Sequence, residues 1–101
     1  MTVRSAVRQF SELGPLPSED DVTDGELEQF DHLLESIIAP VTAEEAELLA
    51  ESFGDDNCFG LAWSLLHLIE TSPVHPISAE PAATANEWVR RLWERRSQAA
   101  D

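Results

Sequence analysis

Proline and glycine breaks divide this chain into short segments, and within each segment apolar residues recur at helical spacing. Gly14-Pro15, Ala39-Pro40 and Gly54 each follow a stretch in which apolar side chains return every three or four residues, which places them on one face of a helix. No segment alternates apolar and polar residues as a half-buried strand does. The pattern predicts an all-α fold of about five helices, expected over residues 3–13, 23–38, 42–53, 58–71 and 78–98.

Two of these helices begin with the same signal, a Thr followed three residues later by a Glu. The pairs are Thr23 with Glu26 and Thr42 with Glu45. In such a capping box the Thr side chain and the Glu backbone N–H bond each other, and the Glu side chain bonds the Thr N–H. Acidic and amide side chains precede the fourth expected helix, and we expect its N-cap among Asp55, Asp56 and Asn57.

The last two expected helices differ in character. The fourth is apolar nearly all round, which favours a place in the middle of the fold. The fifth is expected to begin at Ser78 and to carry the ion pairs Glu87–Arg91 and Arg90–Glu94 on its outside. Its expected inward positions are Ala85, Trp88, Val89, Leu92 and Trp93.

Part of the sequence occurs twice. Residues 32–36 (HLLES) match residues 67–71 (HLIET), and residues 40–46 match residues 76–82, at offsets of 35 and 36 residues. Such a period is typical of stacked αα-hairpins such as HEAT and tetratricopeptide (TPR) units, whose residue signatures are absent here. We therefore expect a single all-α domain over residues 1–101, a short HEAT/TPR-like stack: a capping helix at 3–13, then two tandem αα-hairpin units at 22–53 and 55–98.

Charge restricts the partners of this chain. It has 20 Asp and Glu against six Arg and no Lys, for a net charge of −14, and no Arg lies between residues 9 and 89. Such a surface repels phosphate, so we expect no direct binding of nucleic acid or of an anionic membrane. It attracts a basic protein and speeds the encounter. A lineage with acidic proteins throughout explains the same composition, and charge alone does not separate the two explanations.

Cysteine content and hydropathy restrict the compartment. The single Cys58 excludes a disulfide framework and a cysteine zinc site. No apolar run is long enough for a membrane span, and the first residues lack the apolar stretch of a signal peptide. We expect a cytoplasmic protein.

No group of residues in the sequence predicts catalysis. Cys58 and His67 are nine residues apart on one expected helix, which puts them on opposite faces. His32 and His67 occupy equivalent repeat positions, each three residues before a Glu, but helix packing separates such positions by too much for one metal ion. Residues 20–31 match an EF-hand loop only in part. We expect no enzyme activity, metal or cofactor; a metal-dependent enzyme using the two histidines is a third hypothesis.

The leading hypothesis is a small acidic module that binds and neutralises a basic protein. An immunity- or antitoxin-like inhibitor, with carboxylates occupying the phosphate-binding cleft of a nuclease toxin, is its concrete form. The expected contacts are Asp55, Asp56, Glu44, Glu47 and Glu51.

The alternative hypothesis is a structural or adaptor αα-repeat protein. Such a protein would homodimerise, or dock in a larger complex, through its C-terminal helix. An Arg/Trp hot spot there would make the contact, unless the same side chains fold back onto the acidic body. The residues concerned are Trp88, Arg91, Trp93 and Arg95.

Overall fold

The computed structural model describes residues 3–54, 56–74, 76–77 and 80–99, and within these residues it contains five α-helices and no strand. The predicted all-α class is therefore confirmed. Within the same residues, no helix combines the length and the apolarity that a membrane span requires. The helices are α1 (Ser5–Leu13), α2 (Asp24–Ser36), α3 (Ala43–Ala50), α4 (Leu61–Ile69) and α5 (Glu87–Ala99).

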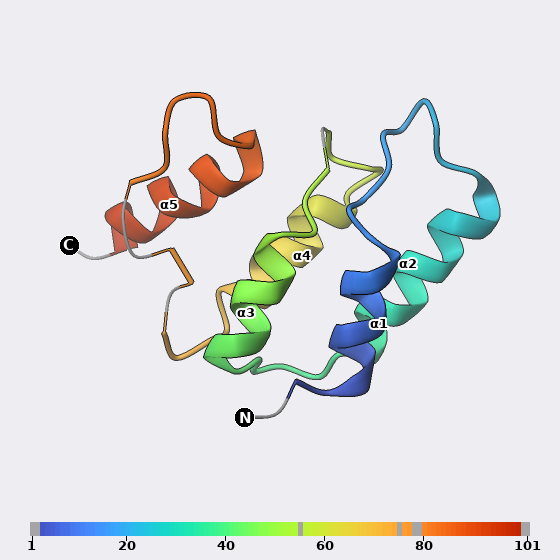
Figure 1. Cartoon of the computed structure of the whole chain (residues 1–101), viewed down its shortest axis with the longest axis horizontal. Coiled ribbons are helices and arrows are strands. Elements are labelled where there is room, and N and C mark those ends of the chain that lie inside the picture. Colours follow the sequence, from blue (N-terminus) through green and yellow to red (C-terminus); the bar gives the residue numbers. More distant parts are fainter. Residues whose placement is uncertain (1–2, 55, 75, 78–79, 100–101) are drawn as a thin grey trace.

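Four of the helices close a ring. α1 packs against α2 and α3, and α4 packs against the same two helices, so the order around the ring is α1, α2, α4, α3. α5 packs against α4 and lies apart from α1 and α2 (Figure 1). This packing does not confirm the expected stack of two αα-hairpins, because α2 has α1 and α4 as its principal neighbours and α1 lies between α2 and α3.

The core fills the space between these helices, and α4 contributes most to it. An edge-to-face contact between Phe10 and Phe30, with ring centroids 5.5 Å apart, joins α1 to α2. Fully burying one leucine-sized side chain stabilises a fold by about 1.5–3 kcal/mol. The buried side chains of α4 therefore make a large contribution to the stability of the fold. The buried residues of α4 are Leu61, Ala62, Leu65, Leu66 and Ile69.

Both predicted capping boxes are present. At the start of α2 the Thr23 N–H donates to the Glu26 carboxylate at 3.0 Å, and the Glu26 N–H donates to the Thr23 hydroxyl at 3.1 Å. At the start of α3 the equivalent distances between Thr42 and Glu45 are 2.9 and 3.1 Å. Each box satisfies N–H groups that a helix end leaves without intrahelical partners.

The predicted start of α4 is wrong. The helix begins at Leu61, with Gly60 as its N-cap, and not at Cys58 behind an Asp or Asn cap. Cys58 and Phe59 have φ angles of +47° and +54°, in the left-handed region that a right-handed helix cannot contain.

The predicted start of α5 is also wrong. Ser78 lies outside the described residues, and residues 80–86 are not helical; the helix begins at Glu87. Pro81 stands where the first repeat has Glu45, so the second repeat lacks a capping box, and a proline disfavours helical backbone in the residue before it. Asn86 caps α5 instead: its side-chain oxygen accepts from the Trp88 N–H at 2.8 Å.

The later start of α5 changes part of what was expected of its residues. Ala85 precedes the helix, whereas Trp88 and Leu92 are buried as expected. The Glu87–Arg91 ion pair is present at 2.8 Å. Arg90 and Glu94 are both exposed and are not among the described ion pairs, consistent with the small energy of a solvated pair.

Candidate functional site

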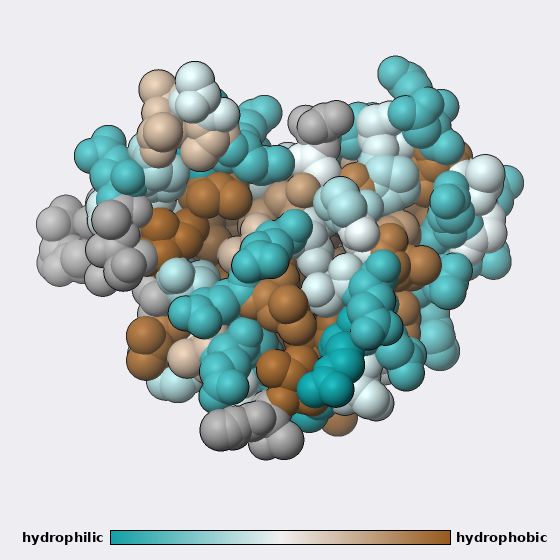
Figure 2. All heavy atoms as spheres, viewed as in Figure 1, coloured by the Kyte–Doolittle hydropathy of each residue, from teal (hydrophilic) through white to brown (hydrophobic). Residues whose placement is uncertain are grey.

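Two of the predicted contact residues lie on α3, and a third, Glu51, is its C-cap. Glu44, Glu47 and Glu51 are all exposed, and spacings of three and four residues place them on one side of the helix. We call these three residues the α3 stripe. Hydrophilic side chains project over the face of the molecule formed by α1 and α3, with apolar patches between them (Figure 2).

Glu45 points into the protein, opposite to the α3 stripe, and its contacts fix the orientation of α3. Its side chain is fully buried, and the Arg4 guanidinium donates to both carboxylate oxygens, Nε to Oε2 at 2.9 Å and Nη2 to Oε1 at 3.0 Å. The Arg4 N–H adds a bond of 2.9 Å. The side-chain hydrogen bonds from Arg4 lower the pKa of Glu45 to about 2, against the opposing effect of burial. This ion pair therefore holds α1 against the start of α3 and leaves the α3 stripe facing solvent.

Of the other two predicted contacts, the structure describes only Asp56. Asp55 lies outside the described residues. Asp56 is partly buried, and its carboxylate accepts the N–H groups of Glu19 at 2.9 Å and of Cys58 at 3.0 Å. Both oxygens of Asp56 thus hold the segment before α2 against the turn before α4, which is a structural role.

Two arginines of α5, Arg91 and Arg95, contact α4. Arg95 makes a two-bond ion pair with Glu70 of α4, at 2.6 and 2.9 Å. The Arg91 guanidinium lies over the rings of Trp88 and Trp63, 4.5 and 5.3 Å from their centroids. Within the part of the chain that the structure describes, the ion pairs are these two arginines with Glu70 and Glu87, together with Arg4–Glu45.

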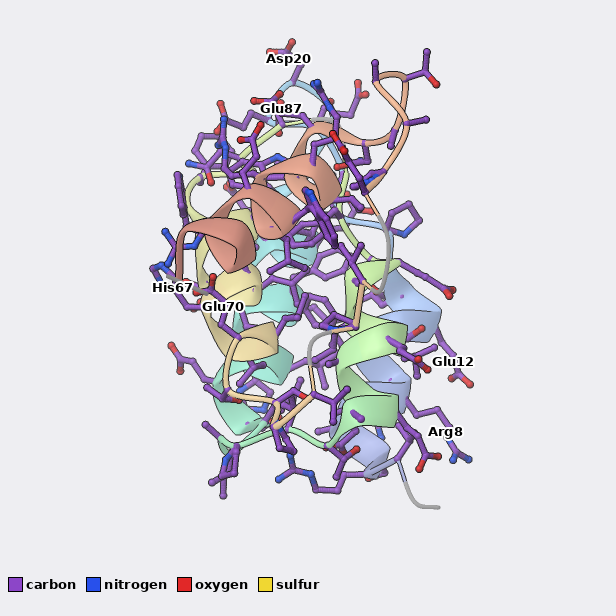
Figure 3. The ribbon with its side chains drawn as sticks, turned by 90° about the vertical axis from the view of Figure 1, so that its left-hand side faces the viewer. Arg8, Glu12, Asp20, His67, Glu70 and Glu87 are labelled. Carbon is purple, nitrogen blue, oxygen red and sulfur yellow. The ribbon has the colours of Figure 1, made fainter. Side chains whose placement is uncertain are left out.

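His32 and His67 lie in different seams of the ring. His32 lines a hollow between α1 and α2, and His67 lines another between α2 and α4. His67 and Glu70 lie on one side of the molecule, and Arg8 and Glu12 project from the other (Figure 3). Among the described residues, no group of three or more His, Cys, Asp or Glu side chains is placed to hold a metal ion.

Cys58 is fully buried and stands beside two carboxylates. Burial, and then the negative charges of Asp56 and Glu19, raise the pKa of its thiol. A thiol held in its protonated form is a poor nucleophile.

Sequence reasoning missed the seam between α2 and α4. Two hollows of about 300 and 380 Å³ follow this seam and share Asp31 as a lining residue. Phe59, with 61% of its surface exposed, stands at one of them. The spacing of Glu28, Asp31 and Glu35 along α2 predicts one acidic helix face. The packing of α4 beside that face depends on tertiary contacts, which the sequence pattern does not contain.

Comparisons of the chain with protein-family models, with curated proteins and with solved structures found no significant match.

Proposed function

We propose that this chain is an acidic protein-binding module that captures a basic protein. One observation carries the proposal: among the described side chains, ion pairs involve the carboxylates of Glu45, Glu70 and Glu87, and the α3 stripe and the acidic face of α2 are exposed without a cation. An uncompensated carboxylate surface attracts Lys and Arg side chains and raises the association rate with a basic partner.

The concrete form is an immunity- or antitoxin-like inhibitor of a nuclease toxin, acting in the cytoplasm. A nuclease binds its substrate with Lys and Arg side chains, because the nucleic-acid backbone is a regular array of negative charges. Glu44, Glu47 and Glu51 present carboxylates along one helix face and thereby offer such a cleft a substitute for phosphates.

The test is capture of the partner from source-organism lysate, at low and at high salt, with mass spectrometry of what is retained. We expect a basic protein in stoichiometric amount at low salt and less of it at high salt. The variant Glu44→Lys/Glu47→Lys/Glu51→Lys should retain less of that protein while keeping its melting temperature. Asp56 is a poor choice for charge reversal, because its carboxylate bonds two backbone N–H groups. Recovery of the protein alone at both salts would contradict the proposal.

A second candidate is an adaptor that self-associates through α5. Two observations favour it. α5 packs on the four-helix ring chiefly through α4. Trp63, on α4, is 38% exposed. Light scattering at several protein concentrations tests it. A concentration-dependent dimer that Trp93→Ala disrupts would support this candidate, and a constant monomer mass would exclude it.

A further inference from the structure

The seam between α2 and α4 holds two neighbouring hollows that share Asp31 and have a floor of apolar side chains. Leu27 and Leu61 line its first hollow, and Leu34 and Leu68 line its second. Leu61 and Leu34 are buried, and Leu27 and Leu68 are partly exposed, so the floor offers apolar surface to a molecule lying in the groove. We call this feature the α2–α4 groove.

The groove is long enough for about two turns of a helix. Its lining residues within α2 run from Leu27 to Glu35, which at 1.5 Å per residue is about 12 Å. Grooves of this kind take the apolar face of an amphipathic helix, whose contacts recur at every third or fourth residue.

The rim of the groove is acidic on the α2 side. Glu28, Asp31 and Glu35 are lining residues, all exposed and none in a described ion pair. The opposite wall carries Ser64 and His67 and contains neither Arg nor Lys. The charge of the rim therefore selects a positively charged occupant.

Phe59 closes one end of the groove as a large exposed apolar side chain. Its backbone is held from outside the groove, because the Phe59 N–H donates to the Glu19 carboxylate at 2.9 Å. The ring thus projects from a backbone that is already fixed, which reduces the entropy lost on binding.

From the apolar floor, the length, the acidic rim and the aromatic end, we propose that the α2–α4 groove binds a basic amphipathic helix. The apolar face of that helix lies over the leucines, and its Lys or Arg side chains meet Glu28, Asp31 and Glu35. This inference rests on the proposed capture of a basic protein and identifies which part of the partner is bound. It also separates the binding groove from the α3 stripe, since α2 and α3 lie across the ring from each other.

The test uses two synthetic peptides of identical composition, each of about five helical turns of Leu and Lys. In one peptide the leucines fall on a single helical face, and in the other they are distributed all round. Isothermal titration calorimetry measures the Kd of each peptide for the full chain. We expect the amphipathic peptide to bind at least about tenfold more tightly than its scrambled counterpart.

Two variants of equal charge locate the binding. Glu28→Lys/Asp31→Lys/Glu35→Lys changes the rim. The control variant Glu12→Lys/Glu80→Lys/Glu94→Lys changes the net charge by the same six units at exposed residues that line neither hollow. We expect the rim variant to weaken binding of the amphipathic peptide by at least about tenfold and the control variant by less than about threefold. Phe59→Gly should weaken it as well, and circular dichroism should show that all three variants remain folded.

The outcomes separate this inference from the proposed function. Equal affinity of the two peptides, or equal losses in the two charge variants, would mean binding through overall charge. That result overturns the groove and leaves capture of a basic protein intact. Groove-specific peptide binding combined with a lysate that yields no basic protein would instead support the groove and contradict the proposed function.

Discussion

Gly54 brings three separate segments of the chain together at one point. The Leu16 N–H donates to the Ser52 carbonyl at 2.9 Å, and the Asn86 side-chain amide donates to the Gly54 carbonyl at 3.0 Å. A Cβ at position 54 would overlap the Leu16 carbonyl oxygen and lie 2.9 Å from the Leu16 carbonyl carbon. Because both neighbours are backbone atoms, they cannot turn aside as a flexible side chain would.

We therefore expect Gly54→Ala to lower the free energy of unfolding by about 1–3 kcal/mol, the usual cost of overpacking a closed site. Gly25→Ala is the matched control. A Cβ there meets nothing within 4 Å, and alanine in place of glycine in a helix should raise stability by roughly 0.5 kcal/mol. Urea titration of both variants gives the two free energies of unfolding. An equal loss of stability in Gly25→Ala and Gly54→Ala would contradict the proposed overlap with the Leu16 backbone.

Phe59 is held in a conformation that costs a residue with a Cβ about 1–2 kcal/mol, at a φ of +54°. Phe59→Gly relieves that cost and removes an exposed ring, so we expect stability to stay constant or to rise by up to about 1 kcal/mol. Ser64→Gly, at an exposed helical position nearby, should instead cost about 0.5 kcal/mol. Urea midpoints compare the two variants, and similar losses in both would show that Phe59 carries no strain.

At the scale of elements, one ion pair joins three parts of the fold. Besides binding Glu45, the Arg4 guanidinium donates to the carbonyls of Ile38 at 2.8 Å and of Pro40 at 3.3 Å. The side chain therefore links the start of α1, the connection from α2 to α3, and the first turn of α3. Removing Arg4 would leave the Glu45 carboxylate buried without its counter-ion.

This arrangement predicts a specific acid sensitivity. The folded-state pKa of Glu45, about 2, is below the ordinary value of 4.5, so the stability it contributes is complete above about pH 4.5 and is lost as the pH falls toward about 2. Glu45→Gln should reduce stability by about 1.5–3 kcal/mol near neutral pH, the usual contribution of hydrogen bonds to a charged group, and the difference from the natural chain should shrink through that window. Urea titration at several pH values measures this, with the exposed Glu44→Gln as control. A difference that is independent of pH would contradict the assignment.

The elements show why part of the fold was predictable. Capping boxes and apolar periodicity are local, so the starts of α2 and α3 and the burial of α4 follow from neighbouring residues. The left-handed backbone at Cys58 and Phe59 carries no local signal, since such φ angles are usual for glycine. The repeat suggested a helix start at Ser78, yet Pro81 replaces the residue that would complete the cap.

The candidate surfaces also divide into those predicted by local sequence and those that depend on long-range contacts. The exposure of the α3 stripe follows from helical spacing and the inward direction of Glu45. The structural role of Asp56 depends on Glu19, 37 residues away, and the α2–α4 groove depends on which helices meet. Pairings between distant segments cannot be obtained from periodicity, and this is also why α1 was expected at one end of a stack.

At the scale of the whole molecule, carboxylate repulsion opposes folding. The net charge is −14, and a net charge far from zero destabilises a compact state. Raising NaCl from about 20 mM to about 300 mM shortens the Debye length from about 20 Å to about 6 Å. We expect a gain of about 1 kcal/mol, which raises the melting temperature by roughly 4–8 °C for a chain of this size.

Differential scanning calorimetry across that range measures the salt effect. The α3 stripe variant, six units less negative, should show a smaller rise, because it has fewer repulsions to screen. Equal salt dependence in both proteins would indicate that the gain comes from general salting-out and not from charge screening.

The position of α1 between α2 and α3 has a consequence for how the chain is made. Ribosomal synthesis releases α1 before the other four helices, but Glu45, which anchors it, follows Arg4 by 41 residues. A nascent chain that ends after α2 carries the buried faces of Val7 and Phe10 with only part of their surroundings. Closure of the ring must await α4, the helix that contacts both α2 and α3. The order of synthesis therefore leaves α1 incompletely packed until α4 has emerged.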